Sequence, residues 1–332
     1  MTTYKGIKGL SIREIAGDPD PLADGDIWYS SVTAKIRGAK TAAGAWASGG
    51  NLPGPASTHF GFGTLTAGVS AGGELSGSSN AEAFHYDGSS WTAGGNINTN
   101  RNVATGFGTQ TAGAIAGGHH PGLPNTVTDI HEQYNGTSWT EAADLNTGRG
   151  YLASATLGTT TAALVMGGLI NPELNPSPFG AVGEKDESEE WNGTAWAEGS
   201  DLNTGRAVST GAGTQTAALF IAGGDTAVAN VEAYNGSTWT EIADVNTAVN
   251  RSSSGGDQND AIKASGNSSA NVEQWDGTSW TEVANVSTTR GYAAFGFSSG
   301  ASNGFIAGGT PPSTNVTEEW TQATAAVTFT SS

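Results

Sequence analysis

The sequence predicts an all-β fold: a six-bladed β-propeller closed by an N-terminal strand, with a small N-terminal β-rich module. Three observations predict it. Segments that begin at a tryptophan recur along the chain, an Asn-Gly or Asp-Gly turn precedes most of them, and glycine supplies 50 of the 332 residues. That glycine share is about twice the usual one and suits many short strands joined by tight turns. Self-similarity at a period of about 40–57 residues is typical of propeller blades.

Five segments carry the repeat most clearly, and each begins at a Trp. In four of them an Arg follows ten residues later, whereas a two-residue insertion in the fourth segment moves its Arg to Arg251. The segments are WTAGGNINTNR from Trp91, WTEAADLNTGR from Trp139, WAEGSDLNTGR from Trp196, WTEIADVNTAVNR from Trp239 and WTEVANVSTTR from Trp280.

Each repeat predicts four strands. A mixed strand follows the Arg, and an apolar strand after it ends in a glycine pair; a variable loop then leads to a strand that ends in an aromatic residue. The pairs are Gly72–Gly73, Gly117–Gly118, Gly167–Gly168, Gly223–Gly224 and Gly308–Gly309, with Ser265–Gly266 in the remaining repeat. The Asn-Gly or Asp-Gly turn after the aromatic residue predicts a hairpin in which both central residues have positive φ.

The tryptophans and the aromatic residues that end the third strands are out of step along the chain. Trp46 has no first three strands before it, and Trp320 has no fourth strand after it. We therefore expect the strand around Trp46 to complete the last blade, which closes the ring without free edges. The expected blades are 52–95, 97–143, 145–200, 202–243, 245–284, and 286–321 with 44–50. The domains are then 1–43, an N-terminal module, 44–321, the propeller, and 322–332, a C-terminal strand or tail.

The order of Arg, Gly-Gly, aromatic residue and Trp resembles the kelch repeat. The resemblance covers roughly residues 44–321 and recurs six times. It implies a propeller with four antiparallel strands in each blade. The turn between the third and fourth strands is shorter here than in the usual kelch pattern.

Two repeated charged positions predict ion pairs rather than a binding site. A Glu lies two residues before the third-strand aromatic in five repeats, so both side chains share one face of the strand. We expect these glutamates to form partly buried pairs with the repeated arginines, fixing each blade to itself or to its neighbour. The arginines are Arg101, Arg149, Arg206, Arg251 and Arg290, and the glutamates are Glu132, Glu189, Glu232, Glu273 and Glu318. The first repeat lacks this Arg, and its Glu82 lies four residues before Tyr86.

The longest loops between second and third strands, 119–130 and 169–188, make one face of the predicted propeller irregular. Binding residues concentrate on loops held by a rigid scaffold. The candidate ligand-binding residues are His119, His120, Asn171, Glu173, Phe179, Lys185 and Asp186. The histidine pair could hold a metal, but it has no acidic partner nearby in sequence, so a solvated loop is the preferred interpretation. We expect no metal and no cofactor.

Composition excludes several classes of function. The chain has no cysteine, so thiol catalysis, the Tyr–Cys cofactor of galactose oxidase and Cys-ligated metals are excluded. The net charge is −18, although the first 40 residues by themselves have a net charge of about +1. The remainder of the chain is therefore strongly acidic, which argues against nucleic-acid binding by it. We see neither a signal peptide nor an apolar run of membrane-spanning length, and expect no membrane insertion. The DGSSW and DGTSW segments are one residue short of the sialidase Asp box, and no spare arginine triad accompanies them.

Residues 1–43 do not follow the repeat. GDIWYSSVTAKIRGA predicts two short strands around a turn, and TYKGIKGLSIREI predicts another. The MTTYKGIKG start, GDIWYSS before the first repeated Trp, and the Thr-, Gly- and Asn-rich repeats resemble kelch-like structural proteins of tailed phages of marine bacteria. By that resemblance residues 1–43 would dock on other virion proteins, and the propeller would face outward.

The expected function is therefore that of a non-enzymatic virion protein, made in the host cytoplasm and present in several copies or as a homo-oligomer on the tail or exterior surface. The preferred hypothesis is a tail-fibre or receptor-binding propeller that recognises a host surface glycan or protein. A capsid decoration or other purely structural virion component is the alternative. A propeller glycosidase or oxidase is the third and least favoured.

Overall fold

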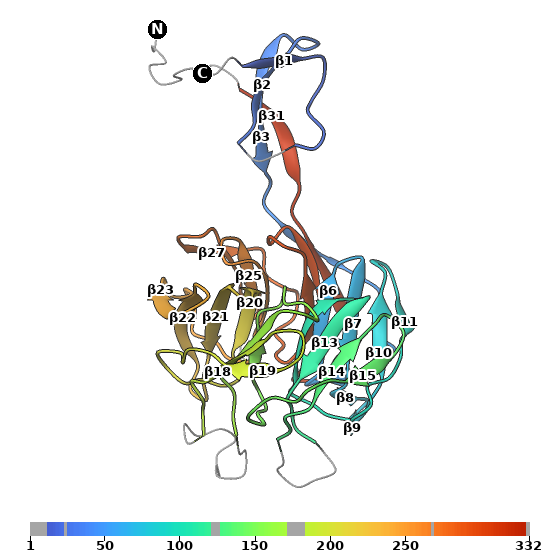
Figure 1. The fold of residues 1–332 in the computed structure, drawn as a ribbon. Coiled ribbons are helices and arrows are strands. Elements are labelled where there is room, and N and C mark those ends of the chain that lie inside the picture. Colours follow the sequence, from blue (N-terminus) through green and yellow to red (C-terminus); the bar gives the residue numbers. More distant parts are fainter. Residues whose placement is uncertain (1–11, 23–24, 121–126, 171–182, 267–268, 330–332) are drawn as a thin grey trace. The chain divides into compact units, whose positions relative to one another are not determined.

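The structure is a computed structural model that describes residues 12–22, 25–120, 127–170, 183–266 and 269–329. Every regular element among them is a β-strand, and the strands form seven four-stranded sheets and one three-stranded sheet (Figure 1). The chain divides into two compact units. Unit 1 consists of residues 1–44 and 322–332, and unit 2 consists of residues 45–321.

Unit 1 contains one four-stranded sheet built from both ends of the chain. Its order is β1 (Arg13–Ile15), β2 (Ile27–Ser30), β3 (Lys35–Thr41) and β31 (Thr324–Thr328). The two strands predicted in GDIWYSSVTAKIRGA are β2 and β3, and they pair antiparallel. The C-terminal segment adds β31, drawn red in Figure 1, antiparallel to β3. Trp28 is buried in this unit, and Asp18 pairs with Arg37 at 2.6 Å.

Unit 2 is propeller-like and contains six four-stranded sheets, numbered here in chain order. Sheet 1 is β6 (Phe60–Thr64), β7 (Ala67–Ala71), β10 (Ala83–Tyr86) and β11 (Trp91–Ala93). Sheet 2 is β12 (Thr105–Thr109), β13 (Ala112–Ala116), β14 (His131–Tyr134) and β15 (Trp139–Glu141). Sheet 3 is β16 (Ala153–Ser154), β17 (Ala163–Met166), β18 (Ser188–Trp191) and β19 (Trp196–Glu198).

The remaining sheets of unit 2 follow the same up-and-down order. Sheet 4 is β20 (Thr210–Thr214), β21 (Ala217–Gly223), β22 (Val228–Tyr234) and β23 (Trp239–Ile242). Sheet 5 is β24 (Ser253–Gly256), β25 (Ala261–Ala264), β26 (Val272–Trp275) and β27 (Trp280–Val283). Sheet 6 is β28 (Ala294–Phe297), β29 (Asn303–Ala307), β30 (Thr317–Thr321) and β4 (Ala45–Ser48). A small additional sheet joins β5 (Ala56–Ser57), β8 (Glu74–Leu75) and β9 (Ser78–Ser79).

Sheet 6 contains the predicted pairing of the two ends of the repeat. β4 pairs antiparallel with β30, and Trp46 lies directly opposite Trp320. In the other sheets a short turn joins the third strand to the fourth. Sheet 6 has no such turn, because its third strand continues into unit 1 after Thr321 and its fourth strand enters from unit 1 at Ala45.

Backbone hydrogen bonds connect the six sheets in cyclic order. In each sheet the second residue of the glycine pair donates its N–H to a backbone carbonyl just ahead of the first strand of the next sheet. Gly118, for example, donates to the carbonyl of Arg149 at 2.8 Å. Gly309 of sheet 6 donates to Ala56, ahead of sheet 1, also at 2.8 Å. The pairs thus serve sheet-to-sheet packing. In sheet 4 the predicted pair is wrong by one residue, because Ala222 and Gly223 take this position: Gly223 donates to Val249.

The tryptophans that open the fourth strands form a second set of connections between sheets. Each indole Nε1 donates a hydrogen bond to the preceding sheet or to the segment that leaves it, so the rings, buried in every case except the partly buried Trp46, pack against two sheets at once. The bonds run from Trp91 to Thr317, Trp139 to Gly95, Trp196 to His131, Trp239 to Ser200, Trp280 to Ala243 and Trp46 to Ala284.

The short turns between third and fourth strands differ from the prediction in one respect. Only the glycine has positive φ, as at Gly136 (92°), and the preceding Asn or Asp does not. The turn spans four residues because Tyr134 pairs with Trp139, and Asn135 Oδ1 accepts hydrogen bonds from the N–H groups of Thr137 and Ser138. An Asx-type turn therefore replaces the two-residue hairpin. In the equivalent turns, hydrogen bonds from the hydroxyls of Ser89 and Thr278, and after them from backbone N–H groups, lower the pKa of Asp87 and Asp276 to about 2.

In sheets 2 to 6 a buried glutamate on the third strand ties the sheet to the link that enters it. A link is the segment between a fourth strand and the next first strand. Glu189 Oε2 accepts a hydrogen bond from the N–H of Asn146 at 2.7 Å, and Arg149 Nη2 lies 2.8 Å from Glu189 Oε1. Arg149 also donates to the carbonyls of Gly167 and Glu187. The pairs Arg206–Glu232 and Arg290–Glu318 repeat this arrangement, while Arg101–Glu132 repeats the ion pair and the link hydrogen bond without the carbonyl contacts; all these side chains are buried.

The prediction for Arg251 is wrong, because the two-residue insertion places Val249 at the repeated arginine position. The Val249 carbonyl accepts the hydrogen bond from Gly223 that the arginine carbonyls accept in the other sheets. Lys263 of β25 supplies the missing charge, since its Nζ lies 3.2 Å from Glu273 Oε1 and both side chains are buried. Glu273 still accepts the N–H of Asn246 at 2.6 Å. The charge of the pair is thus retained on a neighbouring strand.

Sheet 1 lacks the whole arrangement. Ala56 lies at the arginine position and Phe84 at the glutamate position, while the side chain of Glu82 is exposed. Pro53 occupies the place of Asn146 in the link, and proline has no N–H to donate to a glutamate. All three members of the interaction are therefore absent together.

We predict that Lys263→Met destabilises the protein by about 3–5 kcal/mol, because it leaves Glu273 buried without an opposite charge. Arg251→Met is expected to change the free energy of unfolding by no more than about 1 kcal/mol, the range of a partly exposed cation–π contact. Urea titration followed by tryptophan fluorescence measures both. Equal losses in the two variants would contradict the assignment of Lys263 as the partner of Glu273.

Two buried histidines predict loss of stability in acid. Burial lowers the pKa of His59 and of His131 to about 4, and Trp196 donates its indole N–H to His131 Nδ1. Between pH 6.5 and about 4 the unfolded chain binds protons that the folded chain excludes, so stability falls as pH falls. The loss is up to roughly 3 kcal/mol for each group. Unfolding midpoints should fall less steeply over this range in His131→Gln than in the parent.

Candidate functional site

The loops between second and third strands and the links emerge at the same end of each sheet in unit 2, because neighbouring strands alternate in direction. We call this the loop end, and the end that carries the Asn-Gly and Asp-Gly turns the turn end. The turns repeat closely from sheet to sheet, whereas the loop end contains the non-repeated segments 119–130 and 169–188. The residues that do not follow the repeat are therefore concentrated at the loop end.

The described residues include four of the seven candidate ligand-binding side chains. Asn171, Glu173 and Phe179 lie outside the described residues, and His119, His120, Lys185 and Asp186 lie within them. The described parts of the two loops are anchored alike. His119 exchanges backbone hydrogen bonds with Asn102, and Leu169 exchanges them with Gly150. Each loop thus begins by pairing with the link that enters its own sheet.

The histidine pair lies at the start of the loop in sheet 2. His119 is partly exposed, and burial followed by the charge of His120 lowers its pKa. Within the described part of the chain, no group of three or more His, Asp or Glu side chains is arranged to hold a metal ion. The described residues therefore place no third His, Asp or Glu ligand beside the histidine pair.

The second loop returns through residues that brace the scaffold. Lys185 Nζ pairs with Glu187 at 2.9 Å on the surface. Glu184 Oε1 accepts the N–H groups of Ala207 and Asp225, which connects sheet 3 to sheet 4. Asp186 is exposed, while its carbonyl accepts a hydrogen bond from Leu202. Of these residues, Asp186 presents its side chain to solvent most fully.

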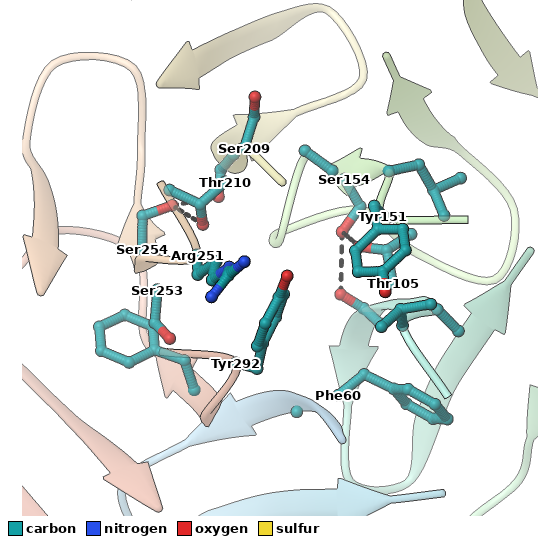
Figure 2. Close-up of a pocket in the computed structure, with 18 of the residues that line it drawn as sticks. Phe60, Thr105, Tyr151, Ser154, Ser209, Thr210, Arg251, Ser253, Ser254 and Tyr292 are labelled. Carbon is teal, nitrogen blue, oxygen red and sulfur yellow. Dashed lines mark hydrogen bonds between the residues drawn. The ribbon is translucent and has the colours of Figure 1, made fainter. Parts of the chain in front are cut away.

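A cavity of about 120 Å³ lies between the starts of the six first strands. Its lining comes from β6, β12, β16, β20, β24 and β28 and from the residues just before these strands, and Figure 2 labels part of it. These residues follow the links, so the cavity belongs to the loop end. We call it the channel site.

The channel site is framed by one residue of positive φ from each sheet. They are Thr58, Val103, Tyr151, Val208, Arg251 and Tyr292, with φ between 48° and 59°. Hydrogen bonds of 2.9 to 3.1 Å pass from the N–H of each of the last five to the carbonyl of the one before it, beginning with Val103 to Thr58 and ending with Tyr292 to Arg251. The left-handed conformation costs about 1–2 kcal/mol at a non-glycine residue, and these inter-sheet bonds offset it.

Hydroxyl groups line the wall of the channel site. Thr105 donates to Ser154 at 2.8 Å, and Thr210 and Ser254 lie 2.6 Å apart, as the dashed lines in Figure 2 show. The hydroxyls of Ser154 and Ser254 donate in turn to carbonyls of the neighbouring sheets. The wall is thereby both polar and held in fixed positions.

Arg251 and two tyrosines point into the channel site (Figure 2). The Arg251 guanidinium carbon lies 5.1 Å from the centroid of the Tyr292 ring, and the rings of Tyr151 and Tyr292 are 5.9 Å apart. Burial raises the pKa of both tyrosine hydroxyls, while the nearby Arg251 acts in the opposite direction. The hydroxyls remain protonated at neutral pH and can donate hydrogen bonds.

Sequence reasoning missed the channel site because it treated Arg251 as one of five equivalent arginines. The insertion in VNTAVNR was visible in the sequence and was the available signal. Nothing in the sequence indicated that Lys263 would replace the arginine beside Glu273, since lysine occurs nowhere else at that strand position.

Comparisons with known proteins describe the fold only. No protein-family model matches the chain, and no curated protein sequence matches it. Among solved structures, the chain is similar to the structure of YjhT, with a TM-score of 0.66 and 14% sequence identity. The similarity covers 83% of this chain and 99% of YjhT. No helix of sufficient length and apolar character to cross a membrane occurs among the described residues.

Proposed function

We propose that this chain is a non-enzymatic virion protein whose six-bladed, kelch-like β-propeller recognises a host surface glycan or protein through its loop end. The observation that carries the proposal is the contrast between the two ends of unit 2. Buried ion pairs, tryptophans and Asx turns repeat from sheet to sheet, and the departures from the repeat gather at the loop end. A rigid scaffold that varies at one end suits recognition.

The six-bladed architecture has two independent supports. Six four-stranded sheets follow one another, with glycine-pair and tryptophan hydrogen bonds running in cyclic order from sheet 6 back to sheet 1. The structural similarity to YjhT extends over most of the chain. The proposed assignment to kelch-like propellers of virions continues to depend on the sequence resemblance.

Unit 1 is the part we propose for attachment to other virion proteins. Six of the seven exposed large hydrophobic side chains among the described residues belong to it. Ile27, Ile36 and Val327 share one sheet face, since Ile27 and Val327 both pair with Gly38 and Ile36 lies two residues before Gly38. They are 50%, 43% and 36% exposed. A single sheet with an uncovered apolar face requires a second layer, which a partner protein can supply.

Competition for host attachment tests the recognition role. Purified full-length chain should reduce adsorption of the virus particles to host cells. Asp186→Lys at the loop end should weaken that competition at least about five-fold, because it reverses an exposed charge on the proposed surface. Thr137→Lys, an exposed change at the turn end, should compete like the parent. Gold-labelled antibody on imaged particles that finds the chain only on the capsid wall, together with no competition, would favour the decoration alternative.

Incorporation into particles tests the attachment role. Replacing Ile27 and Ile36 by Glu should prevent incorporation, because both changes place charge on the apolar face and leave Trp28 buried on the other side. Thr33→Glu, an exposed position in the turn between β2 and β3, is the matched control. Immunoblots of purified particles measure incorporation, and near-ultraviolet circular dichroism checks folding. Normal incorporation of the double variant would exclude this face as the attachment surface.

A further inference from the structure

The outer edge of β31 in unit 1 is an unpaired strand edge without the protection that such edges usually have. β31 pairs with β3 on one side, and no described strand pairs with it on the other. Its five residues, TAAVT, carry no charge, whereas β1 at the opposite edge of the same sheet contains Arg13 and Glu14. Strand edges pair with other chains unless they are short, charged or covered.

The fourth strands of unit 2 show how this chain protects its other outer edges. β15, β19, β23 and β27 each contain a glutamate two residues after the tryptophan. The fourth strands without a charge, β11 and β4, are three and four residues long. Among the described strands at the outer edge of a four-stranded sheet, β31 is therefore the longest that carries no charge.

The hydrogen bonds to β3 show which backbone groups of β31 remain available. The N–H of Phe329 donates to the carbonyl of Ile36 at 3.2 Å, so the odd-numbered residues of this segment turn their backbone groups to β3. In an antiparallel strand the alternate residues turn theirs away from that neighbour. The N–H and C=O groups that point to the open edge are therefore those of Thr324, Ala326 and Thr328.

One side-chain contact reaches this edge and leaves it open. Arg37 Nη2 lies 3.5 Å from the carbonyl oxygen of Ala326, while its Nη1 is held by Asp18 at 2.6 Å. Arg37 extends over the sheet face that contains Trp28, since its guanidinium carbon lies 5.9 Å from the centroid of that ring. A carbonyl has two lone pairs, so Ala326 can also accept a hydrogen bond from a strand added in the plane of the sheet.

The sequence of β31 fits a second copy of itself. An antiparallel pair centred on Ala326 places Thr324 opposite Thr328 of the other copy, and Ala325 opposite Val327 of the other copy. Thr–Thr and apolar cross-strand pairs stabilise sheets, and no like charges oppose each other. The outward-facing residues of the two copies would exchange about six backbone hydrogen bonds. A two-fold axis closes this contact without leaving a further open edge of the same kind.

The distribution of charge favours unit 1 as the place where two copies meet. Unit 1 contains six cations and five carboxylates, whereas unit 2 contains seven cations and 26 carboxylates. Like charges on two copies of unit 2 repel each other, and unit 1 adds little to that repulsion. A contact through β31 therefore uses the nearly neutral part of the chain.

We propose that this chain forms a two-fold dimer in which β31 of each copy pairs antiparallel with β31 of the other, centred on Ala326. The two four-stranded sheets of unit 1 then form one continuous sheet. The apolar faces that contain Val327 adjoin across the contact and offer a wider surface to a second layer. This inference goes beyond the proposed function, because the pairing of two copies requires neither a virion nor a host ligand.

Analytical ultracentrifugation of the purified full-length chain, from about 1 to 200 µM, tests the proposal. We expect a concentration-dependent change from monomer to dimer that strengthens as salt is raised, because salt screens the repulsion between copies of unit 2. Ala326→Pro should remain monomeric, since it removes an N–H that points to the open edge. Proline is tolerated at an edge position of this kind, so near-ultraviolet circular dichroism should match the parent.

Two charged variants test the register of the pairing. The double variant T324K/T328K opposes like charges across the two-fold axis and should weaken the dimer about ten-fold or more. The matched control T324K/T328E changes the same two positions, opposes unlike charges, and should dimerise within about two-fold of the parent. Pairing of β31 with β1 of another copy would not produce this difference.

Three results would overturn the proposal: a parent that is monomeric at every concentration, a dimeric Ala326→Pro, or equal dimerisation of the two charged variants. Hydrogen exchange at the Ala326 amide then identifies the occupant of the edge. Slow exchange in a monomer assigns the edge to another segment of this chain, and slow exchange only in assembled particles assigns it to another virion protein. Because the dimer is measured on the purified chain, failure of the virion role leaves this test unaffected.

Discussion

The six-sheet unit depends on a buried carboxylate that captures the backbone of the entering link. In sheets 2 to 6 the third-strand glutamate accepts N–H groups from the link, and a cation neutralises it. Each link has to cross from the outer strand of one sheet to the inner strand of the next without a regular partner for its backbone. The glutamate supplies that partner, and its own burial is tolerable only because of the cation. The glutamate therefore determines both where the link runs and where a cation must lie, and the path of the link determines which sheet comes next.

The same constraint explains which substitutions the repeat accepts. Sheet 5 changes the source of the cation from the link to β25 and keeps Glu273 in place. Sheet 1 loses the carboxylate, the cation and the link N–H together, as Phe84, Ala56 and Pro53. No sheet in the described residues keeps a buried glutamate without a cation. A carboxylate left alone in this environment would cost more than the complete removal of the arrangement.

The sequence was sufficient for the strands and insufficient for their exceptions. Repetition averages over local ambiguity, so six copies of one pattern indicated the strand order, the pairing of Trp46 with Trp320 and the inward position of the glutamates. A change that occurs in only one repeat cannot be checked against the other copies in this way. The shift of the glycine pair in sheet 4 and the displaced Arg251 both follow from local changes of one or two residues. Their consequences depend on which backbone hydrogen bonds are kept, and spacing alone does not determine that.

For the same reason the channel site was not predictable as a group. Its residues are spread over more than 200 positions of the sequence, and they meet because one residue in each sheet takes positive φ. The backbone of that residue is committed to the neighbouring sheet, as in the bond from Tyr292 to Arg251. Its side chain carries no part of the repeated ion pair, and so it can change without disturbing the frame. The six positions hold Thr, Val, Tyr, Val, Arg and Tyr, whereas the third-strand position of the ion pair holds Glu in five of the six sheets. A frame built this way fixes where the channel side chains are and leaves their chemistry open to change.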